Sequence, residues 1–366
     1  MNYPILEVDY NKIFHNASQM KKRCDKYNVS ISGVIKGMNG TFEIAKAFTE
    51  AQHKYLASSR LRELKTIADS DLDIPLMLIR IPMLSEIDEM VQYVDISVNS
   101  ELEIIKAIEK SCIKFNKKHK IILMMDLGDL REGYYSEEEI IEVAKYIEFQ
   151  LDHVELYGIG TNLSCYGSVM PTTNNMTRLV AIAETIESLI NRRLDVISGG
   201  ATTSIPLLLA GDMPKRINNL RIGEGILLAV DLQDFHGLDM SDFYQDTIVL
   251  KAEIIEIKIK DSYPVGKLSI DAFGNKPTYT DIGKRKRALL ALGKKDIGSH
   301  EKLIPIDPGI KIIGSSSDHL IIDINDAEKD YNIGDIISFR LYYPAMLYSS
   351  QSPDVNKKII NLPKKR

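Results

Sequence analysis

A lysine stands at the end of an apolar segment near the N-terminus and is followed at once by two glycines. The run is Val34-Ile35-Lys36-Gly37-Met38-Asn39-Gly40, and residues 29–35 are predicted to form a β-strand. This lysine is either a solvated strand end or an amine held at the mouth of a buried site. Only in the second arrangement does desolvation make the amine a nucleophile.

Two glycine-rich turns supply a complementary chemistry, the binding of an anion. The first is Ser198-Gly199-Gly200-Ala201-Thr202-Thr203, and the second is Arg221-Ile222-Gly223-Glu224-Gly225. Glycines leave backbone N–H groups exposed, and the hydroxyls of Thr202 and Thr203 add donors at a helix start. The alternative is that both are tight turns without a ligand.

These features lie within an alternation of strands and helices that runs from residue 10 to about residue 230. Residues 11–26 are amphipathic, and residues 41–51 have helical spacing with Thr41 as the N-cap. Eight strand-then-helix units predict a closed (β/α)8 TIM-type barrel, and an open doubly wound sheet is the alternative. The predicted strands are 29–35, 54–58, 75–82, 95–99, 119–127, 153–161, 194–198 and 217–222.

Helical periodicity is largely lost after Asp231. Strands joined by turns are predicted instead, at 249–259, 267–270, 288–292, 303–305, 320–324 and 336–341. The fold class is therefore α/β, with a TIM-type barrel in residues 1–235 followed by an all-β domain in residues 236–366.

The ends of the predicted barrel strands bring the two chemistries together. Catalytic groups of TIM barrels lie at the carboxyl ends of the strands, and phosphate is often bound by the loops after strands seven and eight. Lys36 ends the first strand, and the two glycine turns end the seventh and eighth. This arrangement suits pyridoxal 5'-phosphate, whose phosphate would lie in the turns while its aldehyde forms a Schiff base with the lysine.

Composition limits the other functions. The net charge of -5 argues against a nucleic-acid partner, and no apolar run approaches the roughly 20 residues of a membrane span. No signal-peptide pattern opens the sequence. The cysteines, at 24, 112 and 165, form neither a paired disulfide framework nor zinc-ligand spacing. We therefore expect a cytoplasmic protein without a metal site.

Six short motifs follow one another along the chain in a recognisable order. Because of these motifs, the sequence resembles the alanine-racemase-type (fold type III) family of pyridoxal-phosphate enzymes. The resemblance covers nearly the full length of the chain and is strongest to the ornithine racemase branch of the family. The motifs are Leu6-Glu7-Val8-Asp9-Tyr10 with Asn16, Val34-Ile35-Lys36, Asp126-Leu127-Gly128 with Arg131-Glu132-Gly133, Gly158-Ile159-Gly160-Thr161-Asn162, Leu220-Arg221-Ile222-Gly223, and Gly314 with Ser317-Asp318 and Asp323.

The resemblance implies roles for individual residues. Lys36 would hold the cofactor and move a proton on one face of the substrate α-carbon. Arg221 would face the pyridine nitrogen, and because a guanidinium stays protonated, the ring would be a weaker electron sink. Arg131 would bind the substrate carboxylate or lie near the cofactor phenolate. The other cofactor contacts implied are Asn162, Ser198, Gly200, Ala201, Thr202, Gly223, Glu224 and Tyr343.

The resemblance leaves alternatives for the substrate contacts and for the second catalytic base. Ser317 and Asp318 are expected at the substrate, with Asp318 near the distal amine of a basic amino acid, or else merely ordering its turn. Alanine racemases carry a lysine where this chain has Met124, and a catalytic tyrosine where it has Gly293-Lys294. The second base is then Lys294, Cys165, Ser317 or a group that the sequence does not expose, unless Lys36 acts alone.

The leading hypothesis is a racemase of ornithine or a similar basic amino acid. A racemase of alanine or another small amino acid, a decarboxylase, and a non-catalytic pyridoxal-phosphate homeostasis protein are the alternatives. The last would lack the β domain, whereas a decarboxylase would present an acidic residue, not Arg221, to the pyridine nitrogen and a cysteine where Ser317 stands. By analogy we expect a homodimer in which the β domain of one subunit completes the barrel mouth of the other.

Overall fold

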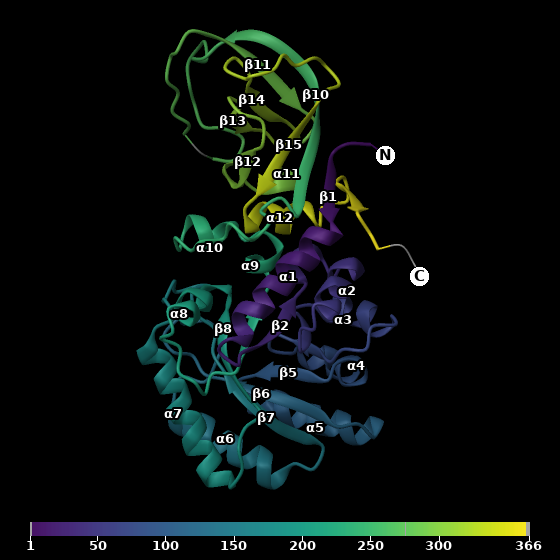
Figure 1. The fold of residues 1–366 in the computed structure, drawn as a ribbon, viewed down its shortest axis with the longest axis vertical. Helices are drawn as coiled ribbons and strands as arrows, with labels where there is room; N and C mark the ends of the chain where they lie inside the picture. Colours follow the sequence, from purple (N-terminus) through teal and green to yellow (C-terminus); the bar gives the residue numbers. More distant parts are fainter. Residues whose placement is uncertain (1, 275, 364–366) are drawn as a thin grey trace. The chain divides into compact units, whose positions relative to one another are not determined.

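The computed structural model describes residues 2–274 and 276–363, and its elements fall into two units (Figure 1). One unit is Asn11–Tyr244, and the other joins Met1–Tyr10 to Gln245–Arg366. These units differ from the predicted ranges 1–235 and 236–366, because the first ten residues belong to the β unit and the later boundary lies at residue 245.

Pairing explains where the first ten residues belong. Strand β1 (Ile5–Asp9) pairs antiparallel with β10 (Ile248–Asp261) and parallel with β16 (Asn356–Ile360). Its burial pattern leaves only its central residue partly exposed. An apolar strand of this kind fits either unit by composition, and its hydrogen-bond partners decide which.

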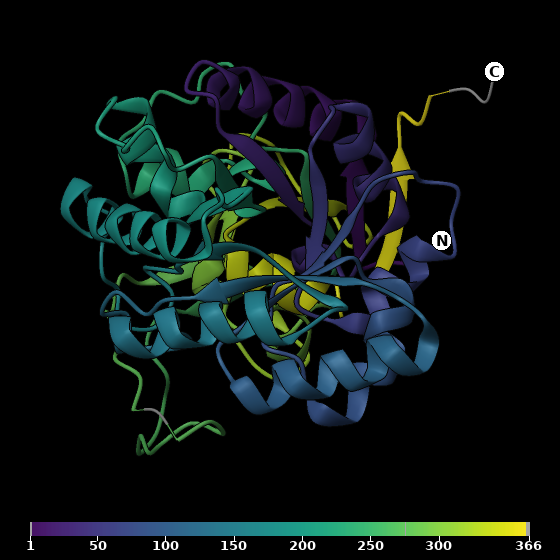
Figure 2. The same ribbon diagram turned by 90° about the horizontal axis from the view of Figure 1, so that it is seen from below.

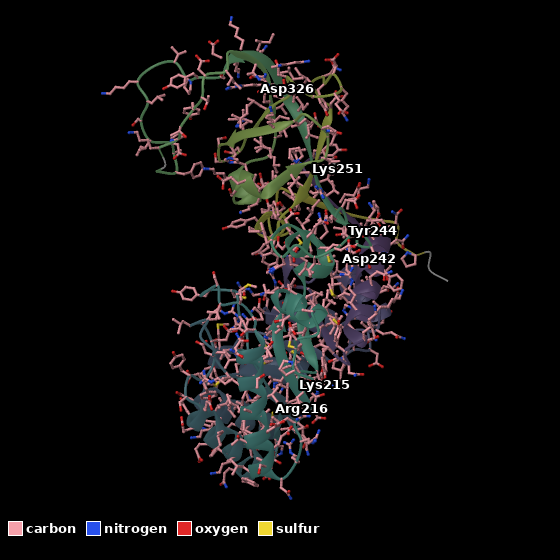
Figure 3. The ribbon with its side chains drawn as sticks, turned by 60° about the vertical axis from the view of Figure 1, so that its left-hand side comes forward. Lys215, Arg216, Asp242, Tyr244, Lys251 and Asp326 are labelled. Atoms are coloured by element: carbon pink, nitrogen blue, oxygen red, sulfur yellow. The ribbon has the colours of Figure 1, made fainter. Side chains whose placement is uncertain are left out.

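The later boundary is set by contacts with the first helix of the barrel unit. Asn16 accepts a hydrogen bond from the Tyr244 amide at 2.9 Å, and Arg23 forms an ion pair with Asp242. Figure 3 shows Asp242 and Tyr244 next to α1 (Tyr10–Asp25). Residues 236–244 therefore belong to the barrel unit although they carry no regular periodicity.

Eight parallel strands close into a barrel, in which β9 returns to pair with β2. This confirms the predicted TIM-type barrel, and the open-sheet alternative is wrong. The helices lie outside the strands (Figure 2). The barrel strands are β2 (Ser30–Val34), β3 (Tyr55–Ser58), β4 (Leu76–Leu78), β5 (Ile96–Asn99), β6 (His119–Met124), β7 (Val154–Gly160), β8 (Val196–Ala201) and β9 (Asn219–Ile222).

The connections between these strands are mostly helical, as a parallel sheet requires. The α-helices after α1 are α2 (Phe42–Glu50), α3 (Leu61–Ala68), α4 (Ile87–Tyr93), α5 (Leu102–Phe115), α6 (Glu137–Gln150), α7 (Thr173–Ile190), α8 (Ile205–Leu209), α9 (Glu224–Leu227) and α10 (Val230–Asp234). The 3-10 turns are η1 (Lys36–Met38), η2 (Leu84–Glu86) and η3 (Thr202–Ser204). Within the described residues, no helix is both long and apolar enough to cross a membrane.

Apolar side chains fill the barrel, so it is a packed core rather than a channel. Met77, Val98 and Ile122 are among the buried residues of this cluster. The hydroxyls of Tyr55 and Tyr157 meet at 2.7 Å inside it, which satisfies both polar groups without water. Met124, which stands where the related family carries a lysine, also belongs to this cluster.

The β unit contains an 8-stranded sheet with the path β12-β15-β10-β11-β14-β13, to which β1 and β16 attach. The predicted strand at 267–270 is wrong, because all four residues are exposed in the connection after β10. Two strands, β13 and β16, and two short helices were not predicted. The remaining elements are β11 (Lys284–Leu290), α11 (Lys294–Ile297), η4 (His300–Lys302), β12 (Leu303–Pro305), β13 (Lys311–Ser315), β14 (Leu320–Asp323), β15 (Ile336–Leu341) and α12 (Tyr343–Ser349).

Candidate active site

Lys36 begins a tight turn at the carboxyl end of β2. The turn continues through Asn39 and Gly40, which both have positive φ, at 54° and 66°. A Cβ on Gly40 would lie 2.7 Å from the Cβ of Glu63, so glycine is required here for space as well as for backbone conformation. Thr41 occupies the N-cap position of α2 as predicted, but its hydroxyl donates to the Met38 carbonyl at 2.6 Å.

Burial lowers the pKa of Lys36 below the ordinary lysine value, so its neutral amine is favoured. Arg131 and Arg221 lower this pKa further, while Cys165 and Glu132 raise it. No ion pair or hydrogen bond reaches the ε-amine from the part of the chain that the structure describes. The desolvated-amine interpretation is therefore supported over a solvated strand end.

Arg221 lies on β9, which pairs with β2, the strand that Lys36 follows, and the residue is 5% exposed. It donates to the Thr161 carbonyl at 2.7 Å and to the Ser198 hydroxyl. Ser198 donates in turn to Asn219 at 2.8 Å, and Asn219 donates to Ser32 at 3.0 Å. Burial lowers the pKa of Arg221 to about 10, which still leaves the guanidinium charged at neutral pH.

The two glycine turns are joined to each other. Thr202 starts η3 directly after β8, and its hydroxyl accepts a hydrogen bond from the Gly225 amide at 3.2 Å. Gly200 has a φ of 104°, a conformation that side chains rarely adopt. Gly223 precedes α9, so the backbone amides of Gly223 and Glu224 lie at the start of the second turn.

Two buried polar atoms in the segment whose Thr161 carbonyl binds Arg221 have no hydrogen-bond partner among the described residues. They are Thr161 Oγ1 and Asn162 Nδ2, directly after β7. An unsatisfied buried polar group costs free energy unless a ligand or water supplies its partner. With the Lys36 amine and the joined turns, these atoms fit a ligand with a carbonyl, polar ring substituents and a phosphate.

Glu224 would place a carboxyl close to such a phosphate, but it is held neutral. Its side chain is buried, and its Oε1 accepts the Asp231 amide at 3.2 Å. Burial, with a smaller contribution from the Asp231 charge, raises the pKa of Glu224 to about 8. At neutral pH the carboxyl is therefore mainly protonated and does not repel an anion bound by its own backbone.

Arg131 lies in a closed loop between β6 and α6. Asp126 accepts the amides of Gly128 at 2.8 Å and Leu130 at 3.2 Å, which fixes the start of this loop. Arg131 pairs with the adjacent Glu132 through both its Nε and its Nη2, the latter at 2.6 Å. Although burial lowers the pKa of Arg131, this pairing raises it above its ordinary value.

Two carboxylates of this loop were missed by the sequence analysis. Glu132 contributes to the electrostatics of both Lys36 and Arg221. Asp129 is buried and accepts backbone amides of the loop that carries Cys165. The only signal for either was their presence in the Asp-Leu-Gly-Asp-Leu-Arg-Glu run.

Cys165 is the exposed cysteine of the chain, whereas Cys24 and Cys112 are buried. Its thiol is close enough to Lys36, Arg131 and Arg221 to affect the pKa of each. The structure therefore brings together the predicted barrel residues at one end of the strands.

Three predicted residues of the β unit lie on neighbouring backbone segments. The Lys294 amide donates to Ser316 at 2.9 Å, and Lys295 donates to the Ser317 carbonyl at 3.2 Å. Gly293 permits this approach, since a Cβ there would lie 2.0 Å from the Ser317 oxygen. Asp318 is adjacent, so Lys294, Ser317 and Asp318 share one end of the β unit.

The side chains of Lys294 and Asp318 already have partners within that unit. The Lys294 Nζ lies 3.6 Å from the centroid of the Phe273 ring. Asp318 pairs with Lys295 at 3.2 Å and accepts the Ser317 hydroxyl at 2.5 Å. These two interactions hold the pKa of Asp318 below its ordinary value.

Tyr343 opens α12, which packs against α11. Ser349 of α12 donates to the Asp296 carbonyl of α11 at 3.1 Å. Tyr343 thus belongs to the same part of the β unit as Lys294.

Known proteins resemble the chain over its whole length. The model of a family described as alanine racemase, N-terminal domain, matches residues 8–229. The chain is 42% identical to ornithine racemase of Acetoanaerobium sticklandii, covering 98% of this chain and 100% of that protein. It is 36% identical to lysine racemase of Thermotoga maritima, covering 98% of each. The solved alanine racemase of Streptomyces lavendulae has a TM-score of 0.77 at 13% identity, covering 99% of each chain.

Replacing Glu224 with glutamine should remove a pH-dependent loss of stability. Because the folded-state pKa is raised from 4.5 to about 8, the stability that the neutral carboxyl contributes is present at acid pH and is lost as the pH rises through that interval. Glutamine keeps an acceptor for the Asp231 amide but cannot ionise. Urea denaturation at several pH values between 5 and 8.5 should show a flatter decline for Glu224→Gln than for the parent.

Glu184→Gln, at an exposed position on α7, serves as the matched control and should decline as the parent does. Parallel declines for Glu224→Gln and the parent would show that the Glu224 carboxyl is ionised in the folded protein.

Proposed function

The chain belongs to the alanine racemase family of amino-acid racemases, and on that premise we propose that it interconverts L- and D-ornithine, or a similar basic amino acid, with pyridoxal phosphate. The observation that carries the proposal is the desolvated amine of Lys36, which stands beside Arg221 and Arg131 at one end of the barrel. The names of the two relatives, ornithine racemase and lysine racemase, support a basic substrate. Their match to the whole chain leaves the non-catalytic carrier without support.

The residues present fit pyridoxal phosphate. We propose that Thr202 and the backbone of Gly200, Ala201, Gly223 and Glu224 hold its phosphate, with Tyr343 completing the set. Asn162 supplies a donor that lacks a partner among the described residues. When bound, the cofactor supplies an electron sink that acidifies the α-proton of the amino acid.

Arg221 limits how strong that sink becomes. Its guanidinium is held in place by Thr161 and Ser198, and it stays charged at neutral pH. A permanently protonated group that faces the ring nitrogen offers a charge but gives up no proton. This favours return of a proton to the α-carbon over other reactions of the activated substrate, and it argues against the decarboxylase alternative.

Lys36 is the proposed base on one face of the α-carbon, because burial lowers the pKa of its amine and so favours the neutral form that accepts a proton. Cys165 is a candidate for the other face, since it shares the barrel mouth with Lys36. Lys294 is the second candidate, and it would act through the proposed homodimer, in which the β unit of one subunit completes the barrel mouth of another.

The reaction itself is tested with the enzyme in deuterium oxide. We expect each enantiomer of ornithine to be converted to the other and to exchange its α-proton, as measured by chiral chromatography and mass spectrometry. Lysine should react as well, and alanine much more slowly. Faster conversion of alanine would overturn the basic-substrate proposal, and absence of exchange with every amino acid would overturn racemisation.

The distal ammonium of the substrate should be recognised by Asp318. Asp318→Asn should lower kcat/KM for ornithine by about a hundredfold, because an ammonium that leaves water needs a carboxylate partner, while alanine turnover should change little. Glu132→Gln is the comparison, since Glu132 is a second carboxylate near the proposed site and is paired with Arg131.

A selective loss of ornithine turnover in Glu132→Gln alone would transfer this role to Glu132. Equal losses on ornithine and alanine in Asp318→Asn would show that Asp318 only orders its turn with Lys295.

A further inference from the structure

One buried carboxylate holds the loop that follows β7. Asp129 is 1% exposed, and both of its carboxylate oxygens accept backbone amides from residues 164–169. Its own carbonyl accepts the Gly167 amide at 3.0 Å. The four amides that donate to the carboxylate are those of Ser164 at 3.0 Å, Cys165 at 3.3 Å, Tyr166 at 3.0 Å and Val169 at 3.3 Å.

This interaction compensates for an unfavourable backbone. Ser164 and Ser168 have positive φ, at 61° and 55°, which costs free energy in residues other than glycine. Burial alone would raise the pKa of Asp129, but the amides of the loop lower it below its ordinary value, so the group stays ionised. Hydrogen bonds to a charged acceptor are stronger than those to a neutral one. The charge of Asp129 therefore maintains a loop conformation that the loop sequence does not favour.

Asp129 joins two loops that carry candidate site residues, Arg131 after β6 and Cys165 after β7. Asp129 is two residues before Arg131 on the β6 loop, and it binds the amide of Cys165 on the β7 loop. The thiol of Cys165 contributes to the electrostatics of Lys36. A shift of the β7 loop would thus move this thiol relative to the lysine without changing either residue.

We propose that Asp129 is a positioning residue, which sets the place of the Cys165 thiol relative to Lys36 by binding residues 164–169. Its importance for proton transfer depends on the proposed racemase function, whereas the control of the loop does not. The proposal concerns Cys165, one of the two candidates for the second face of the α-carbon.

The opposite end of β7 offers a matched control. There Glu109 accepts the amides of His153 at 3.1 Å and Val154 at 2.9 Å, in the turn that precedes the strand. Glu109→Gln and Asp129→Asn therefore remove the same kind of interaction from the two ends of one strand. In each variant the new NH2 group faces backbone donors where an oxygen had accepted.

Hydrogen exchange tests the control of the loop in the intact protein. Asp129→Asn should speed amide exchange at least tenfold in residues 164–169 and leave the turn at 152–154 unchanged, while Glu109→Gln should do the reverse. Gly167→Ala is a second variant, because its Cβ would lie 2.6 Å from the Asp129 carbonyl and displace the loop while the carboxylate is kept. Unchanged exchange of residues 164–169 in Asp129→Asn would overturn the proposal.

A short amine-to-thiol cross-linker then measures whether Lys36 and Cys165 remain close. The cross-linked peptide should form in the parent and in Glu109→Gln, and should fall at least fivefold in Asp129→Asn and Gly167→Ala. Cys24 and Cys112 provide little background, because burial raises the pKa of both thiols to about 12. An equal yield in all four proteins would overturn the positioning role.

The last experiment compares α-proton exchange from the two substrate enantiomers in the variants. In deuterium oxide, Asp129→Asn and Cys165→Ala should each lose α-proton exchange from the same enantiomer of the substrate, more than from the other. Equal losses from both enantiomers would overturn the assignment to proton transfer. If the parent exchanges no substrate at all, the proposed function fails, and the cross-linking result still decides whether Asp129 sets the distance between thiol and amine.

Discussion

The burial of the Lys36 amine beside two guanidinium groups is the constraint on which the rest of the candidate site depends. Burial makes the charged amine costly, Arg131 and Arg221 add to that cost, and Cys165 and Glu132 offset part of it. The cost is smallest when the amine gives up its proton. The environment that disfavours the charged form of Lys36 thus supports its proposed role as a reactive amine.

Closure of the barrel brings the Lys36 amine close to the Arg221 guanidinium. Lys36 follows β2 and Arg221 lies on β9, the first and last strands of the ring, which are about 190 residues apart in sequence but adjacent in register, with Ser32 opposite Arg221. The hydrogen bonds from Arg221 through Ser198 and Asn219 to Ser32 connect β9, β8 and β2. Without the closure between β9 and β2, the two cations would be separated and the link from Asn219 to Ser32 would be lost.

Three acidic side chains near the site are accommodated there in different ways. Glu132 is paired with Arg131, Asp129 is ionised and bound by backbone amides, and Glu224 is held neutral by burial. Each state suits its neighbours: a cation for Glu132, four donors for Asp129, and the proposed phosphate for Glu224.

The barrel was predictable because its strands are apolar runs separated by helical periodicity, and both signals are local. The placement of β1 was not, since an apolar strand does not reveal its hydrogen-bond partner. Residues 267–270 alternate like a strand, yet they are exposed and remain outside the sheet. Among site residues, Lys36 and Arg221 were found from strand ends and motif order.

Asp129 was missed because its partners begin 35 residues later in the sequence, in a loop without periodicity. Asp318 was named from its motif, but its ion pair with Lys295 links two turns that no sequence pattern connects. The reach of sequence analysis therefore ends where a side chain is bound by a distant part of the chain.

The central claim, that the Lys36 amine is the group that reacts with a cofactor carbonyl, is tested most directly by chemical trapping. The protein is loaded with pyridoxal phosphate, reduced with borohydride and mapped by peptide mass spectrometry, alongside Lys36→Arg. The label should be found on the peptide that contains Lys36 and should be absent from the variant. Label on another lysine, or equal labelling of the variant, would contradict the assignment of the active site.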